Sequence, residues 1–262
     1  MKLGTWLPVI LSGVALVGPV HPPHAALAPT NASLAEQYLF AAANQERLSR
    51  GLKPLRHDPL LARAATEHAR AMAEHGTISH QFEGEPDLTR RGASAGVPFS
   101  LISENVGEAP SVATIHDMWM NSDHHRRNLL DPNIDSAGIS VVPRGGEFYA
   151  VEDFARTVRR ATLDDQESSI AEQIAHAGNV TLLASAEGTN SARQTCRTES
   201  GFSGQRRPAF IMRFTSDSLS RLPDELTSRI ASGRYREAAV GACAASQAGP
   251  FTAYNFAVLL YR

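Results

Sequence analysis

The sequence predicts an α+β protein, because helical patterns recur in the first half, a β-hairpin pattern follows, and strand patterns return near the carboxyl end. The chain has 262 residues, of which 42% are hydrophobic and 20% charged, so it can bury a substantial core. Its length allows one large domain or two smaller ones. The formal net charge of -2 argues against a general polyanion binder, so no nucleic-acid partner is expected.

The first 28 residues are predicted to be a signal peptide. Lys2 precedes an uncharged apolar run over residues 3–20, and small residues follow at Ala25, Ala26 and Ala28. The alternative is an uncleaved membrane anchor, but prolines and glycines interrupt the run, whose length is marginal against the about 20 apolar residues of a spanning helix. We therefore expect a secreted or periplasmic protein without a transmembrane span after cleavage.

Two amphipathic helices are predicted at the start of the mature chain. Apolar residues recur at three- and four-residue steps over residues 34–48, up to Gly51, which can end a helix in the left-handed conformation. The second helix has Asp58 as its N-cap and Pro59 in its first position, and it stops at Gly76.

Residues 81–110 lack periodicity and carry Gly, Pro and Ser, so they are predicted to be a long ordered loop with one helical turn after Asp87. Loops of this length inside compact domains often line functional sites. A third helix is predicted to start at Ser111, and Ser122 can cap a short fourth helix over residues 124–129.

A β-hairpin is predicted next, with residues 139–142 and 148–151 on either side of a Pro-Arg-Gly-Gly turn. Residues 161–206 are polar and are predicted to be a linker region with one short helix. Residues 207–262 are predicted to form a small α+β carboxyl-terminal domain, and no internal repeat is found. Its expected elements are a strand over 209–214, a helix over 219–232 and two strands over 238–244 and 252–261.

The two cysteines, Cys196 and Cys243, both lie in the last quarter of the chain. Export would bring them into an oxidising compartment, which favours a disulfide. Closing a loop of about 48 residues would stabilise the fold by about 4 kcal/mol in the chain-entropy model, less any native strain. The alternative is a pair of buried free thiols.

The common hydrolase motifs fail when they are tested against the sequence. There is no HExxH, and residues 201–205 lack the final glycine of a nucleophile elbow. Bonded cysteines would also exclude Cys–His catalysis. What remains is His80, Glu104 and His125, with three outlying residues, His68, Glu152 and Asp153.

His80 and Glu104 bracket the predicted loop. A buried carboxylate near a neutral imidazole could bind a divalent cation or transfer a proton. The alternative is a hydrogen-bonded pair that anchors the loop. His68 lies on the apolar face of the second helix and is interpreted as a structural histidine. His124 and His125 are adjacent on a helix, so only one of them can face a pocket.

Eight short strings follow one another in order over roughly residues 35–156. Together they resemble the bacterial branch of the CAP superfamily (cysteine-rich secretory proteins, antigen 5 and pathogenesis-related 1), whose domain is also called SCP-like. The resemblance implies secretion and a three-layer α-β-α sandwich over residues 34–156. The strings are NQER (44–47), GLKPL (51–55), ATEHA (65–69), SH (79–80), SENV (103–106), WMNSDHHRRNLL (119–130), AGIS (137–140) and VEDF (151–154).

The resemblance also implies a central cavity, which in some family members holds a divalent metal. By this resemblance His80 takes the first histidine position, Glu104 the first acidic position, and His125 the histidine of the bacterial Ser-x-x-His-Arg-x-Asn string. Two positions depart from the family pattern, since Ser122 replaces a frequent Glu and Ala137 an expected His. A set with one carboxylate implies at most a weakly held cation such as zinc, and no required cofactor.

The predicted function is a non-enzymatic binding module. The resemblance implies that its cavity, lined by His80, Glu104 and His125, would take a small apolar ligand, such as a lipid or sterol-like molecule, or a weakly held divalent cation. One alternative is a cell-envelope interaction protein. A hydrolase or protease is disfavoured because no activated nucleophile accompanies the histidines. Glu104→Gln is predicted to remove any metal affinity and to change stability by less than about 2 kcal/mol.

Overall fold

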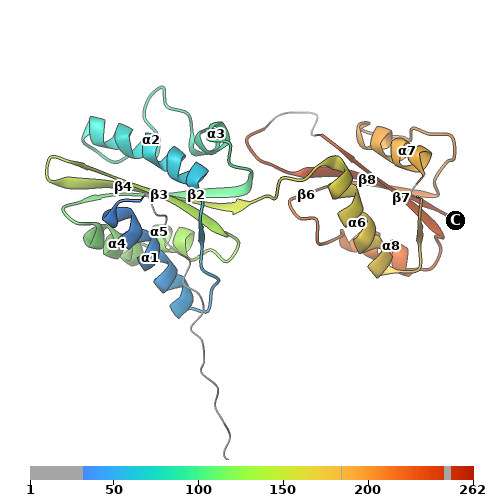
Figure 1. The fold of residues 1–262 in the computed structure, drawn as a ribbon, viewed down its shortest axis with the longest axis horizontal. Helices are drawn as coiled ribbons and strands as arrows, with labels where there is room; N and C mark the ends of the chain where they lie inside the picture. Colours follow the sequence, from blue (N-terminus) through green and yellow to red (C-terminus); the bar gives the residue numbers. More distant parts are fainter. Residues whose placement is uncertain (1–31, 184, 245–248) are drawn as a thin grey trace, which may run out of the picture.

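The protein folds into two α+β domains that follow each other along the chain (Figure 1). The computed structural model describes residues 32–183, 185–244 and 249–262, so the predicted signal peptide lies outside the described residues. Within those ranges, no helix is long and apolar enough to span a bilayer.

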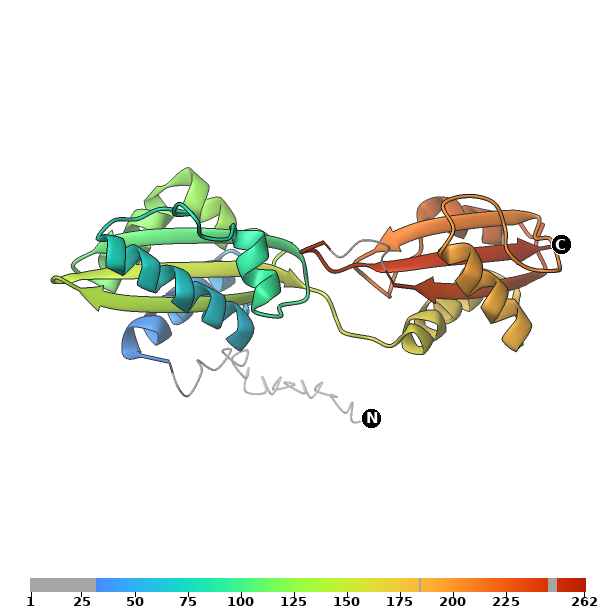
Figure 2. The same cartoon turned by 90° about the horizontal axis from the view of Figure 1, so that it is seen from above.

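The first domain is a three-layer α-β-α sandwich, as predicted. Its four-stranded sheet has the order β1-β3-β4-β2, in which β1 and β3 are parallel and the other pairs antiparallel. Helices α2 and α3 cover one face of this sheet, and α1, α4 and α5 cover the other (Figure 2). The elements are α1 (Leu34–Ser49), β1 (Arg56–His57), α2 (Pro59–His75), α3 (Leu88–Ser94), β2 (Phe99–Ala109), α4 (Val112–Asn121), α5 (Asp123–Leu129), β3 (Ser136–Arg144) and β4 (Glu147–Thr157).

Local signals place the predicted helices of this domain correctly. Ser33 and Glu36 form a capping box at the start of α1, and the Asp58 side chain accepts hydrogen bonds from the first turn of α2. Gly76 ends α2 with a left-handed φ of 63°. The hairpin is also confirmed, with Gly145 and Gly146 in its turn.

The predicted loop over residues 81–110 is wrong in its second half, where β2 pairs with β4 along its whole length. The helical turn after Asp87 is α3. Strand β2 was not predicted because Glu104 and Asn105, which are both buried, interrupt its apolar pattern. Polar residues are expected to face water, so a strand that buries them reads as a loop.

The second domain begins much earlier than predicted. Residues 161–206 are not a linker, since α6 and α7 both pack on the second sheet. Helix α6 buries Ile170 and Ile174, whereas α7 buries mainly small residues that look polar in the sequence. The elements are α6 (Leu163–Ala177), β5 (Thr181–Leu182), α7 (Ala186–Cys196), β6 (Phe210–Ser216), α8 (Asp224–Ala231), β7 (Glu237–Cys243) and β8 (Tyr254–Tyr261).

The two domains have the same topology. The second sheet has the order β5-β7-β8-β6, with one short parallel pair and two antiparallel pairs, which matches the first sheet strand for strand. Helix α7 lies on one face, and α6 and α8 lie on the other. The sequence shows no internal repeat, yet the two halves of the chain share one topology.

A glycine in the third strand of each sheet lets the second helix approach closely. A Cβ added to Gly138 would lie 2.1 Å from the backbone N of Ala62, and one added to Gly241 would lie 2.2 Å from the backbone C of Ala192. We predict that Gly138→Ala and Gly241→Ala each lower the unfolding free energy of their own domain by at least about 2 kcal/mol.

Urea denaturation of the two variants measures this loss. The control is Gly249→Ala, because no atom of the described residues lies within 4 Å of its added Cβ, and it should change stability by less than about 0.5 kcal/mol. Wild-type stability in both glycine variants would contradict the close helix–strand contact.

The predicted disulfide is present and joins α7 to β7 through Cys196 and Cys243, which are 47 residues apart. We predict that the double variant Cys196→Ser/Cys243→Ser lowers the unfolding free energy of the second domain by up to about 4 kcal/mol, because the unfolded chain gains freedom. Calorimetry should show a lower transition for that domain alone. Equal shifts of both domain transitions would count against this assignment.

Candidate functional site

A polar centre lies in the first domain on the sheet face that α2 and α3 cover. Glu104 in β2 and Asp153 in β4 stand opposite each other in neighbouring strands, and both are buried. Helix α2 contributes His68 and α3 contributes Arg91, while His80 comes from the segment between these helices. The sheet register and two helices thus bring five ionisable side chains together.

Glu104 is the hub of this centre. Its Oε1 lies 2.8 Å from His80 Nδ1, its Oε2 accepts a hydrogen bond from Arg91 Nη2, and His68 Nε2 lies 3.9 Å from Oε2. The hydrogen bond to Glu104 raises the pKa of His80, although burial acts in the opposite direction. The His80 side chain is 55% exposed and that of Glu104 only 2%, so the histidine is the part of this pair that solvent reaches.

Arg91 ties the segment before α3 to the same carboxylate. Its side chain is 3% exposed, and its Nη1 donates to the backbone carbonyls of His80 at 3.1 Å and Pro86 at 3.2 Å. The same nitrogen lies 3.6 Å from Glu85 Oε1. A buried guanidinium is tolerated only with such partners, so Glu104 and Glu85 compensate its charge.

His68 is a buried histidine with partners on both ring nitrogens. Nδ1 lies 2.7 Å from Glu85 Oε1, and Nε2 lies 2.7 Å from the carbonyl oxygen of Ser79. A carbonyl oxygen can only accept, so Nε2 donates to Ser79, while Nδ1 contacts the Glu85 carboxyl group. The structural interpretation of His68 is confirmed, because it holds the segment that leads to His80.

Two further carboxyl groups are buried in adjacent positions of β4, on opposite faces of the sheet. Burial raises the pKa of Asp153 well above its usual range, and the neighbouring charge of Glu104 adds to the effect. On the other face, burial raises the pKa of Glu152 to about 8, and the neighbouring Asn105 amide lowers this pKa by a smaller amount. Neither carboxyl group has a hydrogen-bond partner among the described residues. Both are therefore favoured as neutral acids near neutral pH.

His125 lies on α5 and reaches the centre through its backbone. Its carbonyl accepts a hydrogen bond from Asn105 Nδ2 at 3.1 Å, and Asn128 Nδ2 donates to Asn105 Oδ1 and to the Glu104 carbonyl, both at 3.0 Å. Burial lowers the pKa of the His125 imidazole. In the described ranges its ring forms no hydrogen bond or ion pair with His80 or Glu104.

The predicted metal-ligand set of His80, Glu104 and His125 does not fit a divalent cation. Among the residues that the structure describes, no group of three or more His, Cys, Asp and Glu side chains could hold a metal ion. Arg91 and His80 already engage the two carboxylate oxygens of Glu104. A cation would have to displace the buried guanidinium, which would then lose its compensating charge.

Sequence reasoning paired His80 with Glu104 correctly but missed the charges around them. Arg91 and Glu85 were not candidates, because neither belongs to a motif that signals burial. The one available signal is their place in the short segment that follows His80. The sequence left two interpretations open for His80 and Glu104, a cation or proton-transfer site and a pair that anchors the loop. The contacts favour the second, because the pair holds the segment before α3.

The fold and this centre define the first domain as a three-layer α-β-α domain organised around a buried histidine–glutamate pair. Residues 40–158 match the model of the cysteine-rich secretory protein family, CAP. The first domain therefore belongs to the CAP superfamily, as its sequence strings indicated, and its relatives include bacterial proteins.

Two relatives come from Bacillus subtilis (strain 168). The uncharacterized protein YkwD is 31% identical over 122 residues, which cover 45% of this chain and 46% of the relative. The uncharacterized membrane protein YlbC is 27% identical over 110 residues, which cover 40% of this chain and 31% of the relative. This chain thus spans less than half the length of each of these two relatives.

Solved structures also align with this chain. One is an extracellular protein containing an SCP domain, from Bacillus anthracis, which is 26% identical with a TM-score of 0.44. The alignment covers 47% of this chain and 40% of the Bacillus anthracis chain. An outer surface protein from Borrelia burgdorferi is 21% identical with a TM-score of 0.45, covering 47% of this chain and 92% of its own.

Proposed function

We propose that the protein is a non-enzymatic binding module that works outside the cytoplasm. The Cys196–Cys243 disulfide supports an oxidising compartment, and the apolar amino-terminal stretch of the sequence supports export. Membership of the first domain in the CAP superfamily is in keeping with both. The proposed ligand is a small apolar molecule rather than a metal ion.

The observation that carries this proposal is that the acid–base groups of the centre are engaged with one another. The ring of His80 contacts Glu104, whose second oxygen is held by Arg91. The ring of His68 contacts Glu85 and a backbone carbonyl. A hydrolase of the serine or cysteine type needs a histidine in contact with a hydroxyl or thiol, and neither histidine has one within the described residues.

The surface next to His80 suits a ligand with an apolar body and one polar group. Ile78 is 45% exposed and lies two residues before the half-exposed His80. An exposed apolar side chain and an exposed hydrogen-bonding side chain therefore lie two residues apart in the segment between α2 and α3. The alternative of a cell-envelope interaction protein would use the same exposed residues for a larger partner.

Native mass spectrometry of protein secreted by its own host, combined with turnover assays on peptide and ester libraries, tests this proposal. We expect a retained apolar molecule on the wild type, a smaller retained fraction on His80→Ala, and no turnover by either. His124→Ala is the matched control, because it removes another exposed histidine, on α5, that is not part of the pair with Glu104. This variant should retain the molecule like the wild type.

Two outcomes would contradict the proposal. Turnover by the wild type and the His124→Ala variant that disappears in His80→Ala would make the protein an enzyme. Retention that is identical in all three proteins would place the ligand elsewhere.

A further inference from the structure

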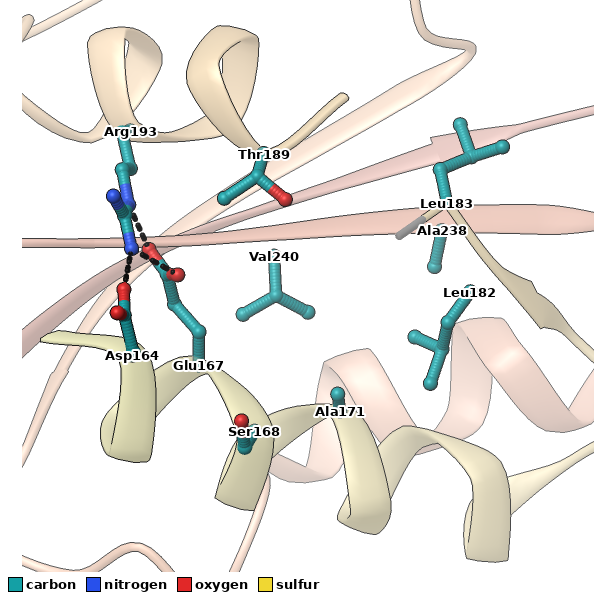
Figure 3. A pocket seen from close by; sticks show the side chains of 10 residues that line it. All are labelled: Asp164, Glu167, Ser168, Ala171, Leu182, Leu183, Thr189, Arg193, Ala238 and Val240. Atoms are coloured by element: carbon teal, nitrogen blue, oxygen red, sulfur yellow. Dashed lines mark hydrogen bonds and ion pairs between the residues drawn. The ribbon is translucent and has the colours of Figure 1, made fainter. Parts of the chain in front are cut away.

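A groove lies in the second domain between α6 and α7, at the edge of the sheet where β5 and β7 meet (Figure 3). Its volume is about 360 Å³, and Val240 of β7 lies in its centre. This size falls within the range of small-ligand pockets. Aliphatic side chains form its middle and one end, and hydroxyl and charged groups form the rest. The aliphatic part of the lining includes Leu182, Leu183 and Val240.

The groove exists because the pairing of β5 with β7 ends farther before the glycine of that strand, Gly241, than the pairing of β1 with β3 ends before Gly138. In the first domain β1 pairs up to Ala137, one residue before Gly138, and the next amide, Asp58 N, donates to the Ala137 carbonyl at 2.9 Å. In the second domain, among the described residues, which omit residue 184, the pairing of β5 extends to Ala238, three residues before Gly241. Within the described part of the chain, the edge of β7 beyond Ala238 therefore has no paired strand beside it.

The backbone of Val240 faces this open edge. Leu183 N donates to the Ala238 carbonyl at 2.8 Å, and Ala242 N donates to Glu167 Oε1 at 2.8 Å. Alternate residues of a strand direct their backbone groups toward the same edge, so the N–H and C=O of Val240 point to the side that β5 and Glu167 occupy on either side of it. An open edge of this kind is the position at which an added extended segment pairs.

Charge distinguishes one end of the groove from the other. Arg193 Nε and Nη2 each lie 2.6 Å from an oxygen of Glu167, and Nη2 also pairs with Asp164. Two carboxylates against one guanidinium leave this end with a net negative charge. The Asp164 side chain is 84% exposed, so it remains accessible to a cation that enters from solvent. The other end is formed by Leu182 and Leu183.

We propose that this groove binds a short extended peptide with small aliphatic side chains and a free amino terminus. Its backbone pairs with Val240, its side chains lie on the aliphatic floor, and its ammonium group lies toward Asp164. Ser168 on α6 and Thr189 on α7 offer hydroxyl groups on the two walls. The site is independent of the histidine–glutamate centre in the first domain.

The test uses the whole chain and the tripeptide Ala-Val-Ala with a carboxyl-terminal amide. Titration is followed by the amide NMR signal of Val240, and we expect a saturable shift. Acetylation of the peptide amino terminus, or the variant Asp164→Asn, should weaken binding about threefold, which is the size expected for an exposed ion pair.

Two variants on α6 distinguish binding in the groove from binding to the surrounding surface. Ser168→Trp should abolish the shift by filling the groove, whereas Glu172→Trp, on an exposed position of the same helix outside the groove, should leave it unchanged. No saturable shift up to ~5 mM peptide would overturn the proposal, since a dissociation constant above that concentration means a binding free energy weaker than about 3 kcal/mol. Equal binding by the Ser168→Trp variant and the wild type would also overturn it.

Discussion

Replacing Glu152 with Gln is expected to stabilise the first domain by about 4 kcal/mol at pH 8. The carboxyl group is fully buried and without a hydrogen-bond partner among the described residues, and its pKa rises from 4.5 to about 8 in the fold. The folded state therefore holds a proton that the unfolded state releases, so stability falls as pH rises from 4.5 to about 8. A glutamine of similar shape has no charge to desolvate and removes this loss.

Urea denaturation across that pH window measures the effect as the difference between wild type and variant. The difference should be small below pH 4.5 and should grow until about pH 8, because only the wild type must keep the proton. His80, whose pKa is also raised, loses its own stabilising contribution as pH rises, but it does so in both proteins. Glu67→Gln, an exposed change on α2, is the control. Parallel pH curves for wild type and Glu152→Gln would contradict a protonated Glu152.

Breaking the buried pair of Glu104 and Arg91 should lower stability by about 3 to 5 kcal/mol for either single variant. Glu104→Gln leaves the guanidinium without its nearest carboxylate, and Arg91→Met leaves the carboxylate without its guanidinium. This exceeds the limit of about 2 kcal/mol that the sequence suggested, because Arg91 was not known to be the partner.

A double-mutant cycle measures the pair directly. The variant Arg91→Met/Glu104→Gln should be more stable than the sum of the single losses predicts, since neither buried charge is then left alone. Additive losses would mean that the two side chains do not compensate each other, and single losses below about 1 kcal/mol would show that solvent reaches the pair.

The sequence predicted best where a structure depends on local rules. Asp58 before a proline, Gly76 after the helix and the paired glycines of the hairpin turn each fix a backbone conformation through their own chemistry. These signals, together with the strings of the CAP superfamily, were sufficient for the layers of the first domain.

The sequence failed where stability depends on partners far along the chain. Strand β2 was missed because Glu104 is buried against Arg91, and nothing local shows that a carboxylate will be compensated. Helix α7 was read as linker because its buried face is built from Gly188, Ser191 and Thr195, which pack closely without being apolar. For the same reason the site was predicted as His80 and Glu104 without their counter-charges.

Because the two domains share one topology, residues at equivalent positions of their sheets can be compared directly. When Gly138 and Gly241 are aligned, the sheet registers place Phe256 at the position of Glu152 and Phe214 at that of Asn105. The two phenylalanine rings lie 5.1 Å apart, where the first domain holds an acid and an amide. One half of the chain thus has a proton-dependent interior and the other an aromatic one. Acidification from about pH 8 to pH 4.5 should therefore raise the stability of the first half relative to the second, because the protonation of Glu152 has no counterpart at Phe256.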